Sequence, residues 1–184
     1  DVGPFRAEFT RGRFYALPGD AGLVMCTWPK GGLREDFKRH WQYGYFNECM
    51  TGFEWQAAAH MVMEGAPVAG GGAGGAIEDA SDPRALTLRG LAVARAIHDR
   101  YAPAKRNPYN EIECSDHYAR AAASWSLLLA VSGFRYHGPR GELGFDPKLG
   151  PDKFRCPFTA AAGWGTFEQK KENGKWTAAI TLRL

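Results

Sequence analysis

The sequence predicts a mainly α-helical domain that ends in a β-hairpin region. Three segments, at about residues 48–64, 82–101 and 116–133, carry apolar residues at helical spacing. Glycine, proline and polar residues, which interrupt helices, separate these segments. After Gly133 the pattern changes to short extended runs, and Asn173-Gly174 lies between two of them. An Asn-Gly pair in that setting is a strong hairpin signal.

Composition is that of an ordinary globular domain. The chain has 184 residues, of which 45% are hydrophobic and 23% charged, enough for one domain with its own core. The net charge is +3 and the basic residues are dispersed, so nucleic acid is not expected as a partner. The sequence contains no regular internal repeat. The four cysteines are far apart, and we expect reduced thiols at Cys26, Cys49, Cys114 and Cys156.

No targeting or membrane-spanning segment is recognisable. The chain begins at Asp1 without the apolar core of a signal peptide. Its longest apolar run, 121–134, is too short to span a bilayer. We therefore expect a cytoplasmic location.

The segment before the first helix is expected to form a hairpin or a structured loop. Apolar stretches at 14–17 and 23–26 flank Pro18-Gly19-Asp20, which has the composition of a turn. Residues 29–46 show no clear period and are expected to form a loop.

The first helix is expected from Glu48 to Glu64, with Gly65 at its C-terminal end. One apolar stripe is expected from Phe53, Ala57, His60 and Met61. The glycine-rich stretch 65–76 follows and predicts a flexible surface loop. It is not a phosphate-binding loop, because no Gly-Lys-Ser/Thr sequence follows it.

The second helix has clear boundaries. Asp82 is a good N-cap, Pro83 suits the first helical position, and Pro103 stops the helix after about Tyr101. Its apolar stripe contains Leu86, Leu91, Val93, Ala94 and Ile97.

The third helix is expected to start at Ser115 or Asp116 and to end at Gly133. One face is expected to carry Tyr118, Ala122, Trp125 and Leu129, with Trp125 in the core. An adjoining face carries His117, Arg120 and Ser124. Beyond it, Gly138–Gly141 predicts a turn, and strands are expected at 164–170 and 176–184.

The densest polar cluster is 107–120, at the start of the third helix. Carboxylates, amides and an arginine beside aromatic residues suit a sugar pocket. The alternative is a capping cluster in which Asp116 and Ser115 cap the helix and Glu111 pairs with Arg120. Glu54, beside Trp55 in the first helix, is a second candidate, and its alternative is a solvent-facing residue.

Three other chemistries are weakly supported. Glu54 and Glu111 would form a retaining glycosidase pair only at a separation of about 5–5.5 Å. Cys114 and His117 are two potential zinc ligands without a second pair, so no metal is expected. A Cys114/His117 nucleophile pair lacks an orienting partner. Of the six tryptophans, Trp164 lies between two glycines and is the one expected at a surface cleft.

Five segments, in order along the chain, together resemble glycoside hydrolase family 116, the non-lysosomal glucosylceramidase and bacterial β-glucosidase type. The most specific is Arg106-Asn-Pro-Tyr-Asn-Glu-Ile-Glu-Cys-Ser-Asp-His-Tyr-Ala-Arg120. The others are residues 21–29, 51–61, 96–101 and 163–167. Ser115 departs from the family pattern, which usually has glycine there, and the glycine-rich stretch resembles an insertion.

The resemblance implies part of an (α/α)6 toroid, with residues 1–184 as the C-terminal portion of a catalytic domain. It implies a retaining β-glucosidase acting on β-glucosides or glucosylceramide, without a cofactor. In the family the nucleophile and acid/base lie upstream of the matched region, so no catalytic residue is assigned here. Glu111 and Arg120 match residues that bind the glucose hydroxyls. Substrate contact is also expected, less directly, for Glu54, His117 and Trp164.

The resemblance also implies partners. The missing N-terminal part of the same protein would complete the toroid, and the full-length protein would make peripheral membrane contact. Three other interpretations stay open: a non-catalytic carbohydrate-binding module, a scaffold domain, and a different (α/α)6 enzyme such as a phosphorylase acting on β-glucosides.

Overall fold

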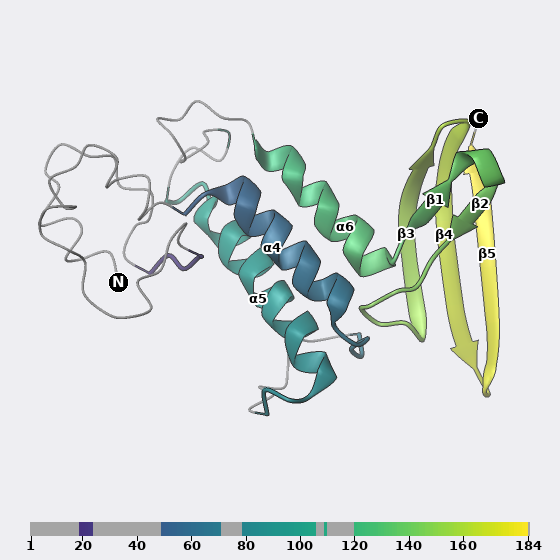
Figure 1. The fold of residues 1–184 in the computed structure, drawn as a ribbon, viewed down its shortest axis with the longest axis horizontal. Coiled ribbons are helices and arrows are strands. Elements are labelled where there is room, and N and C mark those ends of the chain that lie inside the picture. The colour runs from purple at the N-terminus through teal and green to yellow at the C-terminus, as the bar shows by residue number, and fades with distance from the viewer. Residues whose placement is uncertain (1–18, 24–48, 71–78, 106–108, 110–119, 184) are drawn as a thin grey trace, which may run out of the picture. The chain divides into compact units, whose positions relative to one another are not determined.

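The computed structural model describes residues 19–23, 49–70, 79–105, 109 and 120–183. The fold is mixed α+β, with three packed helices and a separate three-stranded antiparallel sheet (Figure 1). The prediction of a mainly α domain is confirmed only in part, because the described residues contain both the three helices and a sheet. The helices in the described ranges do not form a toroid. The chain divides into two compact units, one of residues 1–56 and 92–124 and one of residues 57–91 and 125–184. Each unit is described by itself below.

Helix α4 spans Thr51–Glu64 and ends before Gly65, as predicted. Its buried face differs from the predicted stripe, because Phe53 and His60 are exposed. The residues that are buried are Thr51, Glu54, Ala58, Ala59 and Val62. The apolar residues of this segment run almost all around the helix, so their spacing alone could not identify the buried face.

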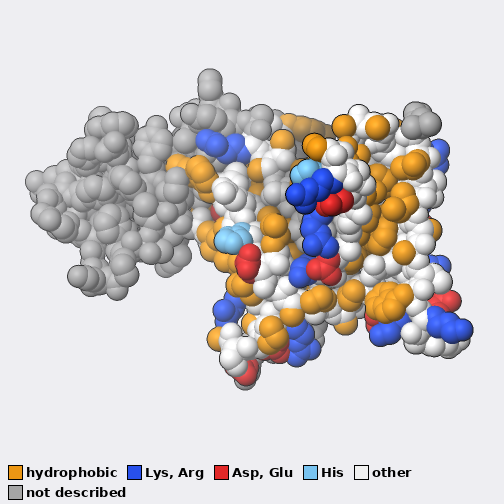
Figure 2. Space-filling view, turned by 45° about the vertical axis from the view of Figure 1, so that its right-hand side comes forward, with side chains coloured by type: hydrophobic (Ala, Val, Ile, Leu, Met, Phe, Trp, Pro, Cys, Tyr) orange, Lys and Arg blue, Asp and Glu red, His pale blue; other side chains and the backbone are white. Residues whose placement is uncertain are grey.

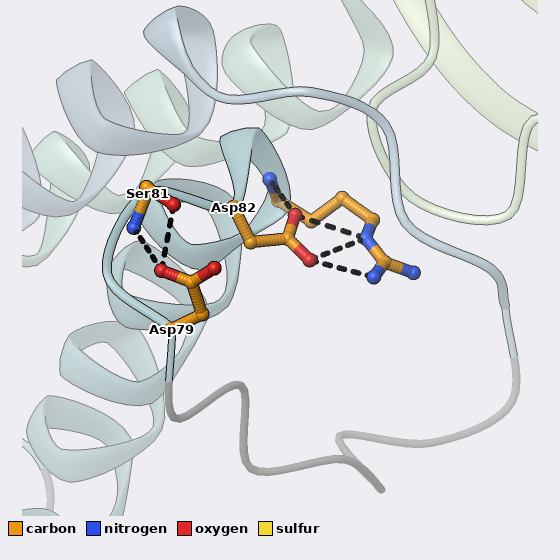
Figure 3. A network of polar contacts seen from close by, with 4 residues as sticks. Asp79, Ser81 and Asp82 are labelled. Carbon is orange, nitrogen blue, oxygen red and sulfur yellow. Dashed lines mark hydrogen bonds and ion pairs between the residues drawn. The ribbon is translucent and has the colours of Figure 1, made fainter.

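Helix α5 spans Pro83–Arg100, which confirms the predicted start and stop. The Asp82 carboxylate accepts a hydrogen bond from the Arg84 backbone N–H at 2.8 Å and forms an ion pair with the Arg84 guanidinium at 2.6 Å. One turn earlier, Asp79 accepts from the Ser81 backbone N–H at 2.8 Å and from its hydroxyl at 2.6 Å (Figure 3). These contacts satisfy N–H groups near the start of the helix, which lack partners within the helix itself.

The third helical segment begins with a 3-10 helix over Arg120–Ser124 and continues as α6, Trp125–Ser132. Trp125 is 50% exposed, so the prediction that it lies in the core is wrong. Ala130 is the buried residue of α6 in the helical core, and Leu127 and Val131 flank it. Since nearly every residue of this short segment is apolar, its spacing could not identify the inner face.

The three helices meet in one small core within the second unit. Ala59 and Val62 of α4 pack with Ala130 of α6, and Leu91 of α5 lies against them. The approach of α4 and α5 is close at Gly90, where a Cβ atom would lie 2.6 Å from the Ala58 carbonyl oxygen. Glycine is therefore required there, even though it weakens the helix itself.

The predicted turn at 138–141 forms a small hairpin. Strands β1 (Arg135–His137) and β2 (Glu142–Gly144) pair antiparallel, and a 3-10 helix over Gly138–Arg140 joins them. Gly141 adopts a positive φ of 64° at the end of that helix.

The larger sheet has the order β3-β4-β5, with β3 at Lys153–Ala160, β4 at Gly163–Glu172 and β5 at Lys175–Arg183. The hairpin between β4 and β5 is confirmed, since Asn173 and Gly174 have φ of 51° and 77° and such left-handed pairs form the favoured tight hairpin turn. Strand β3 was not predicted. Pro157 in its middle argues against a strand unless that strand lies at an edge, which is where β3 lies.

One face of this sheet is apolar and only partly covered. Cys156, Phe158 and Phe167 are buried on it beneath Leu128, Phe134 and Phe145. The same face continues onto β5, where Ile180 is paired with Phe167 and is 50% exposed. Figure 2 shows hydrophobic side chains reaching the surface among charged ones on the side of the view that contains the strands.

Part of the glycine-rich stretch is structured. Val68 is 8% exposed and forms a parallel bridge with Leu149, so residues 66–70 are not simply a flexible loop. Residues 71–76 of that stretch lie outside the described residues, as do most of the predicted N-terminal hairpin and the loop at 29–46. Gly19, inside the predicted turn, has a φ of 84°.

Two further predictions concern thiols and membranes. Cys49 and Cys156 are free thiols, while Cys26 and Cys114 lie outside the described residues. Among the helices that the structure describes, none combines the length and apolarity needed to cross a membrane.

Candidate functional site

The candidate site is built in the first unit around a buried ion pair between Glu54 of α4 and Arg100 of α5. Both side chains are almost fully buried, with exposed fractions of 2% and 0%. The two guanidinium Nη atoms donate to the two carboxylate oxygens, Nη1 to Oε1 at 3.0 Å and Nη2 to Oε2. Such a two-point pair fixes the orientation of both groups.

This ion pair holds the backbone of residues 21–23. Glu54 Oε1 accepts a hydrogen bond from the Leu23 backbone N–H at 2.7 Å. Arg100 Nη1 donates to the Ala21 carbonyl oxygen at 2.9 Å. The segment therefore supplies one donor and one acceptor to the pair, which lowers the cost of keeping two charges away from water.

Gly22 allows that close approach. A Cβ atom at this position would overlap with Arg100 Nη1 and with Glu54 Oε1, and it would lie 3.3 Å from Cys49 Sγ. No side chain fits between the segment and the ion pair, so position 22 requires glycine for space.

Two further contacts join the same elements. The Thr51 hydroxyl lies 2.9 Å from the Tyr101 hydroxyl. Lys105 Nζ forms an ion pair at 2.8 Å with Asp20, whose side chain is fully buried. Both contacts link residues near an end of a helix to another part of the first unit and reinforce the arrangement around Glu54.

Arg120 lies against the first turn of α4. Its guanidinium carbon is 5.6 Å from the centre of the Phe53 ring, a distance at which a cation is attracted to an aromatic face. A Cβ atom on Gly52 would lie 2.7 Å from Arg120 Cδ. Arg120 is thus positioned by Gly52 and Phe53, the two residues that precede Glu54.

The structure brings together two of the five predicted substrate-binding residues. Glu54 and Arg120 belong to the same unit and are linked through the first turn of α4. Trp164 is in the second unit, 53% exposed on the sheet face opposite Phe167. Glu111 and His117 lie outside the described residues. The predicted face shared by His117, Arg120 and Ser124 assumed an α-helix, and the described part of it is a 3-10 helix.

Glu54 does not face solvent, so the alternative given for it is wrong. Its two carboxylate oxygens are engaged by Arg100 and by Leu23, which suits a residue that positions its neighbours. A carboxylate in this setting is not presented for attack on an anomeric carbon. Direct contact between Glu54 and a sugar stays a prediction.

Sequence reasoning missed Arg100 and Gly22 as site residues. A signal for Arg100 was present, because it falls three residues after Ile97 on the buried face of α5. A charge on an apolar stripe indicates a buried partner. Gly22 gave no such signal, since the need for space arises only where three distant segments meet.

Metal binding finds no support in the described ranges, where no group of three or more His, Cys, Asp or Glu side chains is arranged to hold an ion. The potential ligands Cys114 and His117 are outside those ranges.

Comparisons with protein-family models, curated proteins and solved structures found no match to this chain.

Proposed function

We propose that this chain supplies the glucose-binding part of a retaining β-glucosidase of the family 116 type, which acts on β-glucosides or glucosylceramide. The catalytic nucleophile and acid/base would come from another part of the complete (α/α)6 enzyme, which we place in the cytoplasm with peripheral membrane contact. In that enzyme a carboxylate attacks the anomeric carbon, an acid protonates the leaving oxygen, and water hydrolyses the glycosyl-enzyme.

One observation carries the proposal: in the first unit, described residues from four of the five segments that resemble the family contact one another. Residues 21–23 bind to Glu54 and Arg100, which come from two other segments. Arg120, the last residue of the most specific segment, packs on Gly52 and Phe53. Segments that make one site are expected to meet in this way.

The roles follow from the contacts. Arg120 would bind sugar hydroxyls through its planar set of donors, and Glu111 would accept from them. Glu54 and Arg100 would hold residues 21–23 and the first turn of α4 in place, so that Arg120 is presented at a fixed position. This positioning restricts the bound sugar and leaves bond cleavage to other groups.

The first test measures glucose binding to residues 1–184 by isothermal titration calorimetry. We expect saturable binding that weakens about tenfold or more in Arg120→Ala and in Glu111→Ala, because each change removes hydrogen bonds to a charged group. Arg120→Lys keeps the charge but loses the forked geometry, and it should restore only part of the affinity. A folded protein that binds no glucose would contradict the proposal and favour a scaffold domain.

The second test uses the full-length protein and a chromogenic β-glucoside. We expect hydrolysis that releases β-glucose first, as retention requires. Glucose binding without hydrolysis would indicate a carbohydrate-binding module. Turnover that requires phosphate and yields glucose 1-phosphate would indicate a phosphorylase.

A further inference from the structure

A small pocket lies in the second unit, on the apolar side of the sheet. Its walls come from Gln169 of β4, Trp176 of β5 and the loop around Asp146. Its volume is about 260 Å³, just below the range of about 300–1,000 Å³ that is usual for pockets of drug-sized ligands. A pocket of this size suits a ligand of one ring.

Trp176 gives the pocket an aromatic wall. It is 53% exposed, although its strand partner Lys171 places its Nζ atom 5.2 Å from the centre of the ring. This contact between a cation and an aromatic face holds the ring in place. An exposed and oriented indole offers a flat apolar surface for the C–H groups of a ligand.

Two polar side chains stand beside that wall. The Asp146 carboxylate is 63% exposed and lies 3.5 Å from Lys148 Nζ. The Gln169 side-chain N–H donates to the Pro151 carbonyl oxygen at 2.7 Å, which fixes the amide. The carboxylate is a strong acceptor for hydroxyl groups, and the neighbouring Lys148 balances its charge. A neutral ligand rich in hydroxyl groups therefore fits this chemistry better than an ion.

The pocket is formed in advance by its backbone. Pro67, Pro147 and Pro151 contribute walls with restricted φ angles. The surrounding loop is tied to the rest of the unit by backbone hydrogen bonds, from Lys148 N to the Val131 carbonyl and from Lys171 N to the Asp152 carbonyl, both at 2.8 Å. Little order would have to be gained when a ligand binds, which favours binding by a small contact area.

We infer that this pocket binds one pyranose ring of a neutral carbohydrate, with the ring stacked on Trp176 and its hydroxyl groups on Asp146 and Gln169. The inference does not depend on the proposed glucosidase activity. It uses none of the residues assigned to the glucose site, and Arg120, the described member of that site, is not among the residues that line the pocket.

The test is a titration of residues 1–184 with methyl β-glucopyranoside, followed by two-dimensional NMR. The indole N–H signal of Trp176 is assigned by its absence in Trp176→Phe. We expect this signal to shift in a saturable manner. In the variants, the affinity of the pocket is measured from the Gln169 side-chain amide signals. This affinity should fall about tenfold or more in Trp176→Ala, because the stacking surface is lost. A fall of about tenfold is expected in Asp146→Asn, since hydrogen bonds to a charged acceptor are about twice as strong as neutral ones.

Ile180→Ala is the matched control. Ile180 lies on the same strand and the same face as Trp176, is 50% exposed and does not line the pocket. Its replacement should leave the affinity unchanged while the spectrum confirms the fold. A Trp176 signal that does not move, or an affinity that Ile180→Ala lowers as much as Trp176→Ala does, would overturn the inference. So would sugar binding that Glu111→Ala abolishes and Trp176→Ala leaves intact, because the sugar would then occupy only the proposed glucose site.

Discussion

The two units are stabilised in different ways. In the first unit a charged pair, Glu54 and Arg100, is fully buried and joins segments that are far apart in the sequence. In the second unit a group of aromatic rings fills the space beneath the sheet, with the Phe145 and Phe167 rings stacked at a centroid distance of 4.0 Å. The first interior depends on direction and charge, and the second depends on volume and apolar area.

The two units should therefore differ in which substitutions they tolerate. A buried ion pair fails when one partner is removed, because the other charge then lacks compensation. An aromatic cluster accepts apolar replacements of similar volume at modest cost. Conservative changes should therefore be severe in the first unit and mild in the second.

The largest effect is expected for Glu54→Gln. The change keeps the shape but removes the carboxylate charge that pairs with the buried Arg100 guanidinium, at a cost of about 3–5 kcal/mol in the free energy of unfolding. Urea denaturation followed by circular dichroism measures it. Arg95→Ala, which removes an exposed ion pair with Asp99 on α5, should have no measurable effect. Equal stability of the Glu54→Gln variant and the parent protein would break the comparison.

A comparable loss is expected for Phe167→Ala, which empties a buried site in the aromatic cluster. Deletion of a buried phenylalanine side chain costs about 3–5 kcal/mol, whereas a change to leucine should cost much less. The matched control is Ile180→Ala at the directly paired position, where the side chain is half exposed. Thermal unfolding of the three variants tests the rule that volume matters here, and equal losses in Phe167→Leu and Phe167→Ala would contradict it.

A smaller effect concerns alkaline pH. Burial raises the pKa of the Cys156 thiol above its ordinary value of 9.0, although a hydrogen bond with Ser132 opposes this. The unfolded state then ionises first, so stability is complete below the ordinary pKa and falls as pH rises toward the folded one. Urea titrations at about pH 8 and about pH 10 should show a smaller loss in Cys156→Ala than in the parent protein. The same loss in both proteins would remove Cys156 as the cause.

The smallest effect is expected at the exposed start of α5, which belongs to neither interior. Hydrogen bonds from Arg84 lower the pKa of the Asp82 carboxyl. The contribution of this carboxylate to the free energy of unfolding is therefore complete above the ordinary pKa of 3.8 and is lost only as pH falls through the lowered pKa. Asp82→Ala should lower the melting temperature slightly at neutral pH. Asp82→Asn keeps an oxygen that can accept the capping hydrogen bond, so its melting temperature should fall less. A drop as large as that of Glu54→Gln would show that this cap supports more than its own helix.

Local signals predicted much of the fold. Asp82-Pro83 set the start of α5, and Asn173-Gly174 set the hairpin between β4 and β5, because each depends on a few adjacent residues. The inner faces of α4 and α6 were assigned wrongly, because apolar residues lie almost all around both helices and their spacing does not single out one face. Strand β3 was missed because an edge position, which admits Pro157, is a property of the whole sheet. Arg100 and Gly22 required knowledge of which distant segments meet.

The two outer edges of the sheet are unlike. On β3, Pro157 lacks a backbone N–H and Arg155 carries a charge paired with Glu168 on β4, two features that discourage pairing with a further strand. On β5 the nine residues from Lys175 to Arg183 contain no proline and carry charge only at the two ends. Of these two edges, only the β5 edge is suited to pair with a further strand. An additional strand would join beside β5, where its apolar side chains would extend the row that Trp176, Ile180 and Leu182 begin.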